Sequence, residues 1–301
     1  MIILDYSQVA LSNILSFQRD LQKNMNEAKT SEAINIIRHA VLSSIKFYKK
    51  KYGKEYGEIV IACDGRQYWR REHFEYYKGS RKKNREKSDL DWKLVFDTLS
   101  DLREDLAKNF PYKVVHIDRC EADDIIAALT KWTQTNDLKT EGLYEEPQKV
   151  LIVSSDKDFK QLHKYGNVKQ WSPMQKKFVE SPKGDEYLIE HIVRGDSGDG
   201  IPNIFSKDDV FMVEGDRQQA VTAKKLAKFQ ELRIDACENE EQKRNWQRNQ
   251  LLVDFEFIPE DVRQSVIDTY TGLKPKGDKM SIMTYLIKHK CRMLLDELED
   301  F

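Results

Sequence analysis

The sequence lacks a large net charge of either sign. Its 50 Lys and Arg residues nearly balance its 51 Asp and Glu residues, which gives a formal net charge of −1. The overall composition is therefore neither that of a basic nucleic-acid-coating protein nor that of an acidic disordered chain. Any recognition of a charged partner must rest on a local cluster.

Long hydrophobic runs and an export signal are also missing. No apolar run approaches the roughly 20 residues that a membrane-spanning helix requires. The first residues, MIILDYSQ, lack a charged segment followed by an extended apolar stretch. We expect a soluble cytoplasmic protein with no membrane partner.

Cysteine is scarce and scattered. Cys63, Cys120, Cys237 and Cys291 form no CxxC pair and have no histidine at metal-ligand spacing. This pattern argues against a structural zinc site and indicates reduced thiols, as in the cytosol.

The sequence does contain short apolar runs at residues 1–4, 58–63, 113–117 and 149–153, with helical patterns between them. Near-continuous apolar strands that alternate with helices predict an α/β fold, with a mostly parallel sheet flanked by helices on both faces. The 301 residues, 40% of them hydrophobic, are enough for one large domain or two ordinary ones.

The strand pattern stops near residue 191. We therefore expect an α/β domain over residues 1–190 and a smaller helical domain over residues 191–301. Within the first domain, Ser88 is the expected N-cap of a helix that includes Trp92. The helical patterns of the second domain are at 216–230, 239–252, 259–271 and 280–299.

Acidic residues follow each predicted strand. Asp5 comes directly after the first strand, Asp64 after the second and Asp156 after the fourth. Because the carboxyl ends of parallel strands line one crevice, these side chains are expected to meet there. The glycine-rich segment RGDSGDG adds two more acids. The carboxylates expected in the crevice are Asp5, Asp64, Glu121, Asp123, Asp124, Asp156, Asp158, Asp196 and Asp199.

So many ionised carboxylates require cations, because each close pair costs on the order of 4 kcal/mol even at an effective dielectric constant near 20. Oxygen ligands without His or Cys favour hard ions, with Mg²⁺ as the first choice and Mn²⁺ or Ca²⁺ as alternatives. Two such ions would stabilise the attacking and leaving oxygens of a displacement at phosphorus. The crevice therefore predicts two-metal chemistry on a phosphodiester.

Each acid also has a simpler interpretation. An Asp after a strand is often the N-cap of the next helix, and this is the better interpretation of Asp5, Asp64 or Asp124 taken singly. The repetition at four strand ends favours the metal site instead.

A basic and aromatic segment covers residues 66–87. Its nine Lys and Arg residues face three Glu residues, and aromatic residues such as Tyr68 and Tyr77 lie between them. Cations pair with phosphates and flat rings stack on unpaired bases, so the segment predicts a binding site for a single strand. A solvated helix face is the alternative. The cations are Arg66, Arg70, Arg71, Lys78, Arg81, Lys82, Lys83, Arg85 and Lys87.

Together these motifs resemble those of the 5′ nucleases, the structure-specific exonucleases and flap endonucleases of replication. EADD (121–124), SSDKDF (154–159) and RGDSGDGI (194–201) are similar to the acidic motifs of that family in order and spacing, and YKGSR (77–81) to its helical-arch motif. The resemblance covers nearly the whole chain. It implies a PIN-like nuclease domain with a basic arch near residues 66–95, followed by a helical DNA-binding domain.

The resemblance also implies an activity: magnesium-dependent removal of RNA primers and of 5′ DNA ends or flaps. Lys78 and Arg81 match arch cations that contact the scissile phosphate, and Tyr77 would stack on the terminal base. With Asp123, these two cations are the expected catalytic residues. The first metal is assigned to Asp5, Asp64, Glu121 and Asp123, and the second to Asp156, Asp158, Asp196 and Asp199, with Asp124 between them.

The implied partners are DNA and RNA–DNA hybrids, with a sliding clamp and a single-stranded DNA-binding protein as further candidates, and the implied state is a monomer. If the chain is encoded by a phage, it acts in the host cytoplasm. One departure concerns the segment IPNIFSKDDVFMVEGD, which lacks two glycines of the duplex-gripping motif in cellular relatives. Duplex binding in the usual form is not expected there.

Two alternatives remain open. A PIN-like endoribonuclease would share the acidic crevice but would need neither the basic arch nor the acids of RGDSGDG. A non-catalytic junction-binding protein would retain DNA binding and give no product with magnesium.

Overall fold

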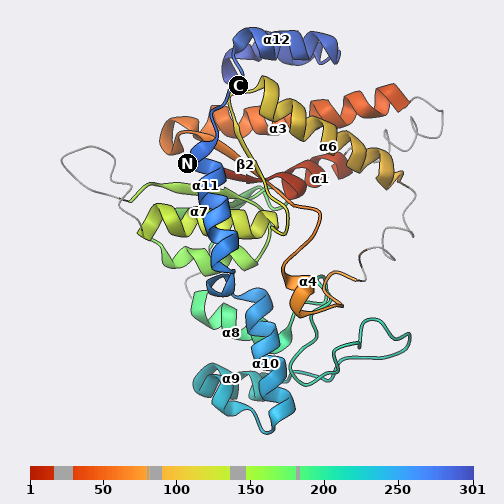
Figure 1. The fold of residues 1–301 in the computed structure, drawn as a ribbon, viewed down its shortest axis with the longest axis vertical. Coiled ribbons are helices and arrows are strands. Elements are labelled where there is room, and N and C mark those ends of the chain that lie inside the picture. Colours follow the sequence, from red (N-terminus) through yellow and green to blue (C-terminus); the bar gives the residue numbers. More distant parts are fainter. Residues whose placement is uncertain (17–29, 80, 82–89, 136–146, 181–183) are drawn as a thin grey trace.

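The computed structural model describes residues 1–16, 30–79, 81, 90–135, 147–180 and 184–301 (Figure 1). In this part of the chain, six strands form one sheet with the order β3-β2-β1-β4-β5-β6. Neighbouring strands from β3 to β5 are parallel, and β6 is antiparallel to β5. The mostly parallel sheet is thus confirmed. The strands are β1 (Ile2–Asp5), β2 (Ile59–Cys63), β3 (Lys113–His116), β4 (Val150–Val153), β5 (Val168–Ser172) and β6 (Lys177–Val179).

Two of these strands, β5 and β6, are absent from the sequence-based prediction. The reason lies in polar residues at buried positions of β5, where Gln170 and Ser172 interrupt the apolar signal. The amide of Gln170 donates hydrogen bonds to the carbonyl oxygens of Ser154 (2.9 Å) and Asp156 (2.6 Å). These bonds fix the backbone that follows β4.

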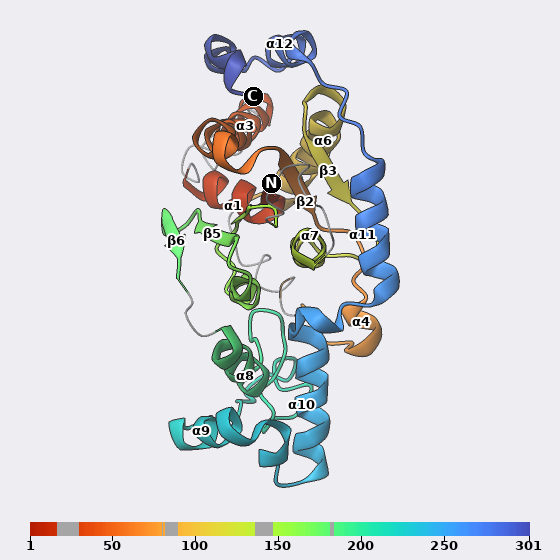
Figure 2. The same ribbon diagram turned by 90° about the vertical axis from the view of Figure 1, so that its left-hand side faces the viewer.

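Helices cover both faces of the sheet (Figure 2). Ile2 and Leu4 of β1 pack into one apolar cluster with α1, α3 and α6, whereas Met1 and Ile3 pack into a second with α7 and α11. Alternate residues of one strand therefore serve two cores, which explains the continuous apolar runs. The helices are α1 (Tyr6–Ser16), α3 (Thr30–Tyr56), α6 (Trp92–Asn109), α7 (Ala122–Thr135) and α11 (Glu260–Gly272).

The N-cap of α6 is Asp91, whose side chain accepts a hydrogen bond from the amide of Leu94 (3.0 Å). The predicted cap, Ser88, lies outside the described residues. Asp and Ser are both good N-caps, so the sequence alone does not choose between them.

A third apolar cluster lies beyond the carboxyl end of the sheet, at the lower end of Figure 1. Helix α8 (Gly184–Arg194) packs there on α9 (Ala223–Leu232) and α10 (Glu240–Val253), and the short helix α4 (Arg70–His73) leads to Phe74 and Tyr77 in the same cluster. This cluster brings the basic segment close to the strand ends.

The last helices return to the sheet. After η3 (Phe255–Phe257), α11 packs on α7 and β3, and α12 (Lys279–Lys288) and η4 (Arg292–Asp300) pack near α3 and α6. The helices of residues 191–301 therefore pack in two places, α9 and α10 with α8, and α11, α12 and η4 against the sheet and its helices. Helical periodicity reveals an apolar face but not the layer that buries it. None of the described helices is long and apolar enough to span a membrane.

The C-terminal Phe301 is buried rather than presented to a partner. Its side chain is 7% exposed, and its ring centroid lies 5.5 Å from that of Phe110. We expect Phe301→Ala to lower the free energy of unfolding by about 3–5 kcal/mol, because it removes a large buried ring. Urea denaturation measures this loss. Met293→Ala in the same segment is the control, since Met293 is 78% exposed; an equal effect of the two changes would contradict the packing described.

Candidate active site

Asp5, Asp64 and Asp156 lie together at the carboxyl ends of β1, β2 and β4. Burial, and then the negative charge of Asp64, raises the pKa of Asp5 to about 7. Burial and the neighbouring Asp158 raise the pKa of Asp156 to about 6. The acids are thus close enough to repel one another, as the strand order requires.

Hydrogen bonds fix the first two carboxylates. Asp5 accepts from the amide of Gln8 (3.1 Å) and from the hydroxyl of Ser154 (2.9 Å). Asp64 accepts from the hydroxyl of Ser7 (2.8 Å) and from the amide of Ala122 (3.0 Å) at the start of α7. Asp5 thus caps the helix that follows its strand, as the simpler interpretation has it, whereas Asp64 satisfies a backbone donor of the distant helix α7 and not of the next helix.

Asp123, in the first turn of α7, is half-buried in the same crevice. Burial and the charge of Asp156 raise its pKa well above its ordinary value, although Lys78 opposes the shift. A narrow recess lined by Asp123, Asp158, Asp196 and Asp199 joins the sheet to the loop after α8. Asp156, at the end of β4, lines the neighbouring cleft together with Asp158 and Asp196, so a strand-end carboxylate and the RGDSGDG segment share one site.

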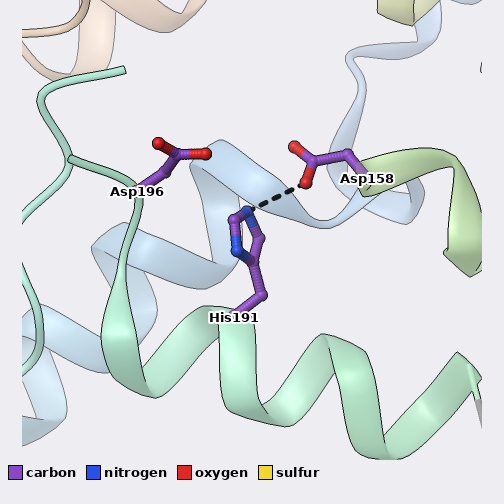
Figure 3. A group of neighbouring side chains, drawn as sticks. All are labelled: Asp158, His191 and Asp196. Atoms are coloured by element: carbon purple, nitrogen blue, oxygen red, sulfur yellow. Dashed lines mark ion pairs between the residues drawn. The ribbon is translucent and has the colours of Figure 1, made fainter. Parts of the chain in front are cut away.

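Asp158, His191 and Asp196 lie on the α8 side of this site (Figure 3). Nε2 of His191 lies 3.2 Å from Oδ1 of Asp158, so the imidazole and the carboxylate form an ion pair. Burial lowers the pKa of His191, but Asp158 outweighs it and brings the value to about 9. Burial likewise raises the pKa of Asp158, yet His191 holds it below the ordinary value. The side is open to solvent through a cleft of about 520 Å³.

His191 is absent from the sequence-based prediction, because the predicted ligands were acids that follow a strand or lie in a glycine-rich loop. The sequence does contain one signal for it: His191 comes four residues after Tyr187, so the two side chains lie on one face of α8. The hydroxyl of Tyr187 donates to Oδ1 of Asp158 (3.1 Å), and the rings of Tyr187 and His191 stack with their centroids 5.6 Å apart.

Lys78 and Arg81 face the acids from the basic segment. The ammonium group of Lys78 bonds Glu121 and lies 3.6 Å from Oδ2 of Asp199, and Arg81 bonds Oδ1 of Asp199. The backbone also joins the two segments, since the amide of Lys78 donates to the carbonyl of Asp199 (2.7 Å). This approach requires glycine at position 200, where a Cβ atom would lie 2.9 Å from the carbonyl oxygen of Tyr76.

Glu121 is fully buried and is compensated by several donors. Burial raises its pKa, but Lys78 and Arg70 together hold it below the ordinary value. The hydroxyl of Tyr77 donates to the same carboxylate at 3.0 Å. Glu121 is therefore an anion already paired with cations of the basic segment.

Arg70 and Tyr77 point inward, as the buried Lys78 also does. For Arg70 and Tyr77 this corrects the expectation that they contact nucleic acid. Arg70 is 3% exposed, and its guanidinium pairs with Glu121 (2.7 Å) and Asp124 (2.8 Å) and donates to the carbonyl of Leu252 (2.8 Å). Tyr77 is 3% exposed, so its ring face is not open to a base. Sequence spacing does not show which side of the short helix α4 faces the acids.

Asp124 is enclosed by the groups that hold it. Besides Arg70, it accepts from the indole N–H of Trp69 (3.1 Å) and from the amide of Glu121 (2.9 Å). Burial raises its pKa and Arg70 opposes the shift. These partners give Asp124 a structural role at the start of α7, while its predicted metal contact stays a prediction.

Other cations of the segment remain accessible. Arg66, Arg71 and Arg81 are exposed, which suits contact with phosphates. The remaining predicted contacts, Lys82, Lys83, Arg85 and Lys87, lie outside the described residues.

The donor set fits divalent cations. Burial and mutual repulsion raise the pKa values of Asp5, Asp123 and Asp156, so these anions lack sufficient positive charge near them. A dication in the crevice would supply that charge and would be bound by carboxylate oxygens, the ligands that Mg²⁺ prefers. Asp158, next to Asp156, and Asp196 add oxygens on the α8 side, together with one imidazole nitrogen.

Comparison with known proteins agrees with this geometry. Residues 2–190 match the family model described as 5′-3′ exonuclease, N-terminal resolvase-like domain, and residues 183–301 match the model described as T4 RNase H, C terminal. The chain therefore belongs to the 5′-3′ exonuclease family of nucleases.

Within that family, the chain is 34% identical to the ribonuclease H of Enterobacteria phage T4 over 310 aligned positions, which cover 99% of this chain and 95% of the relative.

Two solved structures share the fold at 18% identity. They are the T5 D15 protein co-crystallised with metal ions (TM-score 0.58, 89% of this chain and 97% of that chain) and the T5 5′-exonuclease with bound zinc (TM-score 0.60, 91% and 98%).

The ion pairs of Arg70 lead to a prediction on stability. Arg70→Met is expected to lower the free energy of unfolding by about 3–5 kcal/mol, because it leaves the buried Glu121 and Asp124 without their shared cation. Chemical denaturation in chelator measures the loss. The neighbouring Arg71 is exposed, so Arg71→Met is the matched control and should change stability by less than about 0.5 kcal/mol. Similar values for the two variants would refute the role given to Arg70.

Proposed function

We propose that this protein is a magnesium-dependent 5′-3′ nuclease that removes RNA primers and 5′ DNA ends or flaps during replication. One observation carries the proposal: Asp156 at the end of β4 lines the same cleft as Asp196 of the RGDSGDG segment, and Lys78 and Arg81 pair with Asp199 of that segment. Family membership supports a nuclease, and the mixture of acids and cations supports a phosphodiester as the substrate.

The acids divide into two groups that would each hold a dication. Asp5, Asp64 and Asp123 form the group at β1, β2 and α7, and Asp158 and Asp196 belong to the group at η1 (Asp158–Lys164) and α8. Two bound Mg²⁺ ions would supply a nucleophile at neutral pH and would neutralise charge at the scissile phosphate.

The cations of the basic segment act on the substrate. Lys78 pairs with Glu121, and Arg81 pairs with Asp199. A scissile phosphate in the crevice would lie close to both cations, which would stabilise the charge that develops on its oxygens in the transition state. Exposed Arg66 and Arg71 would contact the backbone of the same strand and orient it.

The test uses two 5′-labelled substrates, a flap DNA and an RNA–DNA hybrid, each with Mg²⁺ or with EDTA. We expect short 5′ products from both substrates in Mg²⁺ and none in EDTA. The two substrates also distinguish a 5′ nuclease from an endoribonuclease. An endoribonuclease would cut the hybrid at internal positions and leave the DNA flap intact. Binding of both substrates without product in Mg²⁺ would refute the proposal and favour a junction-binding protein.

A further inference from the structure

The α8 side of the site differs chemically from the β1 side. Ligand atoms of Asp158, His191 and Asp196 all lie within 4.8 Å of one another, and they come from η1, from α8 and from the segment after α8 (Figure 3). Atoms bound to one ion at about 2.0–2.4 Å are at most about 5 Å apart, so the three groups can share a cation. By contrast, Asp5, Asp64 and Asp123 offer only oxygen.

The three side chains are held in place before any ion binds. The side chain of His191 is 10% exposed and stacks on Tyr187, whose hydroxyl donates to Asp158. Asp196 accepts from the amides of Gly198 (2.7 Å) and Asp199 (3.2 Å). Preorganisation of this kind lowers the cost of binding, because little side-chain freedom remains to be lost.

Imidazole changes the metal preference of a site. Carboxylates suit Mg²⁺ and Mn²⁺ alike, whereas imidazole nitrogen suits first-row transition metals and is a poor ligand for Mg²⁺. We infer that His191 is a direct nitrogen ligand of the cation on the α8 side. This side therefore prefers transition-metal dications to Mg²⁺, and its preference is stronger than that of the all-oxygen side.

The inference rests on the proposed dication chemistry and deepens it. Coordination replaces the ion pair between Nε2 and Asp158, and the ring ligates in its neutral form with release of a proton. Asp158 then binds the cation that His191 also contacts. The second cation of this protein is thus expected to have mixed nitrogen and oxygen ligands.

Pulsed EPR of Mn²⁺ tests this directly, because it detects the ¹⁴N coupling of a coordinated imidazole. The samples are the full chain with two equivalents of Mn²⁺, His191→Gln and the matched control His163→Gln. His163 lies on η1 but bonds Gln170 instead of an acid. We expect ¹⁴N coupling in the parent and in the control, and its loss in His191→Gln. Calorimetry should show roughly tenfold weaker Mn²⁺ binding in that variant, with a smaller change for Mg²⁺.

Several outcomes would overturn the inference: Mn²⁺ bound without ¹⁴N coupling in the parent, coupling that persists in His191→Gln, or equal losses of Mn²⁺ and Mg²⁺ affinity. The first outcome is measured on the parent protein alone, so the inference can be refuted even if His191→Gln fails to fold. The result is also separable from the proposed function. Magnesium-dependent 5′ cleavage without ¹⁴N coupling would refute only the inference, and coupling without cleavage would refute only the proposed activity.

Discussion

Replacing Asp123 by Asn is expected to reduce 5′ cleavage about 10³-fold and, in chelator, to make the protein more stable. The first effect follows from the several kcal/mol of transition-state stabilisation that a bound dication provides, where each 1.36 kcal/mol is tenfold in rate. The second follows from repulsion, because burial and the charge of Asp156 both oppose ionisation of Asp123.

The sign of the stability effect depends on pH. A carboxyl group whose pKa is higher in the folded than in the unfolded chain stabilises the fold when protonated, and this contribution is lost as the pH rises through the folded-state pKa. Both Asp123 and Asp5, whose pKa is about 7, belong to this class. Asn is neutral at every pH, so at pH 8 the free energy of unfolding of the variant should exceed that of the parent by about 0.5–2 kcal/mol. This difference between variant and parent should be smaller at pH 5.

Calorimetric unfolding at pH 8 and pH 5 in EDTA measures this gap, and addition of Mg²⁺ should stabilise the parent more than the variant. Asp101→Asn is the matched control, because Asp101 is exposed on α6. A variant less stable than the parent at pH 8 in EDTA would contradict the electrostatic description of the crevice.

The convergence of acids could be predicted because the backbone leaves little choice. A continuous apolar run such as residues 59–63 must lie in a sheet covered on both faces, and parallel strands place Asp5, Asp64 and Asp156 at one edge. The position of the acids thus follows from strand direction alone, which a hydrophobic pattern determines.

The partners of these acids could not be predicted in the same way. Arg70 and Arg71 are adjacent and identical in type, yet Arg70 is buried against Glu121 and Arg71 is exposed. That difference depends on the direction of a four-residue helix, α4, which is too short to show periodicity. His191 escaped detection for a related reason, since the amphipathic pattern of α8 indicates a buried face and says nothing of which charged group it meets.

The sequence pattern also does not predict the layer in which each C-terminal helix packs. Val262 and Val266 of α11 and Ile282 of α12 give similar apolar patterns, but α11 packs on the α7 face of the sheet and α12 on the α3 face. Both arrangements bury comparable apolar side chains, so a local apolar pattern does not show which face of the sheet each helix covers.

Replacing Lys78 by Ala should lower the cleavage rate about 10²- to 10³-fold while weakening substrate binding far less. The ammonium group lies between Glu121 and Asp199, and the backbone amide is tied to the carbonyl of Asp199. The cation is thus fixed beside the predicted position of the scissile phosphate, where charge increases in the transition state. Glu121 keeps Arg70 and Tyr77 as partners, so the variant should fold.

Single-turnover cleavage in Mg²⁺ and fluorescence anisotropy in Ca²⁺ separate the two quantities for Lys78→Ala. Lys157→Ala provides the comparison, because Lys157 is an exposed lysine that lines the cleft on the α8 side of the site, beside Asp156. A lysine that only attracts the phosphate backbone contributes equally to the ground state and the transition state, so this variant should lose affinity with little change in the single-turnover rate at saturation. If Lys78→Ala showed that same pattern, Lys78 would be a binding residue, and transition-state stabilisation would have to come from Arg81 and the dications alone.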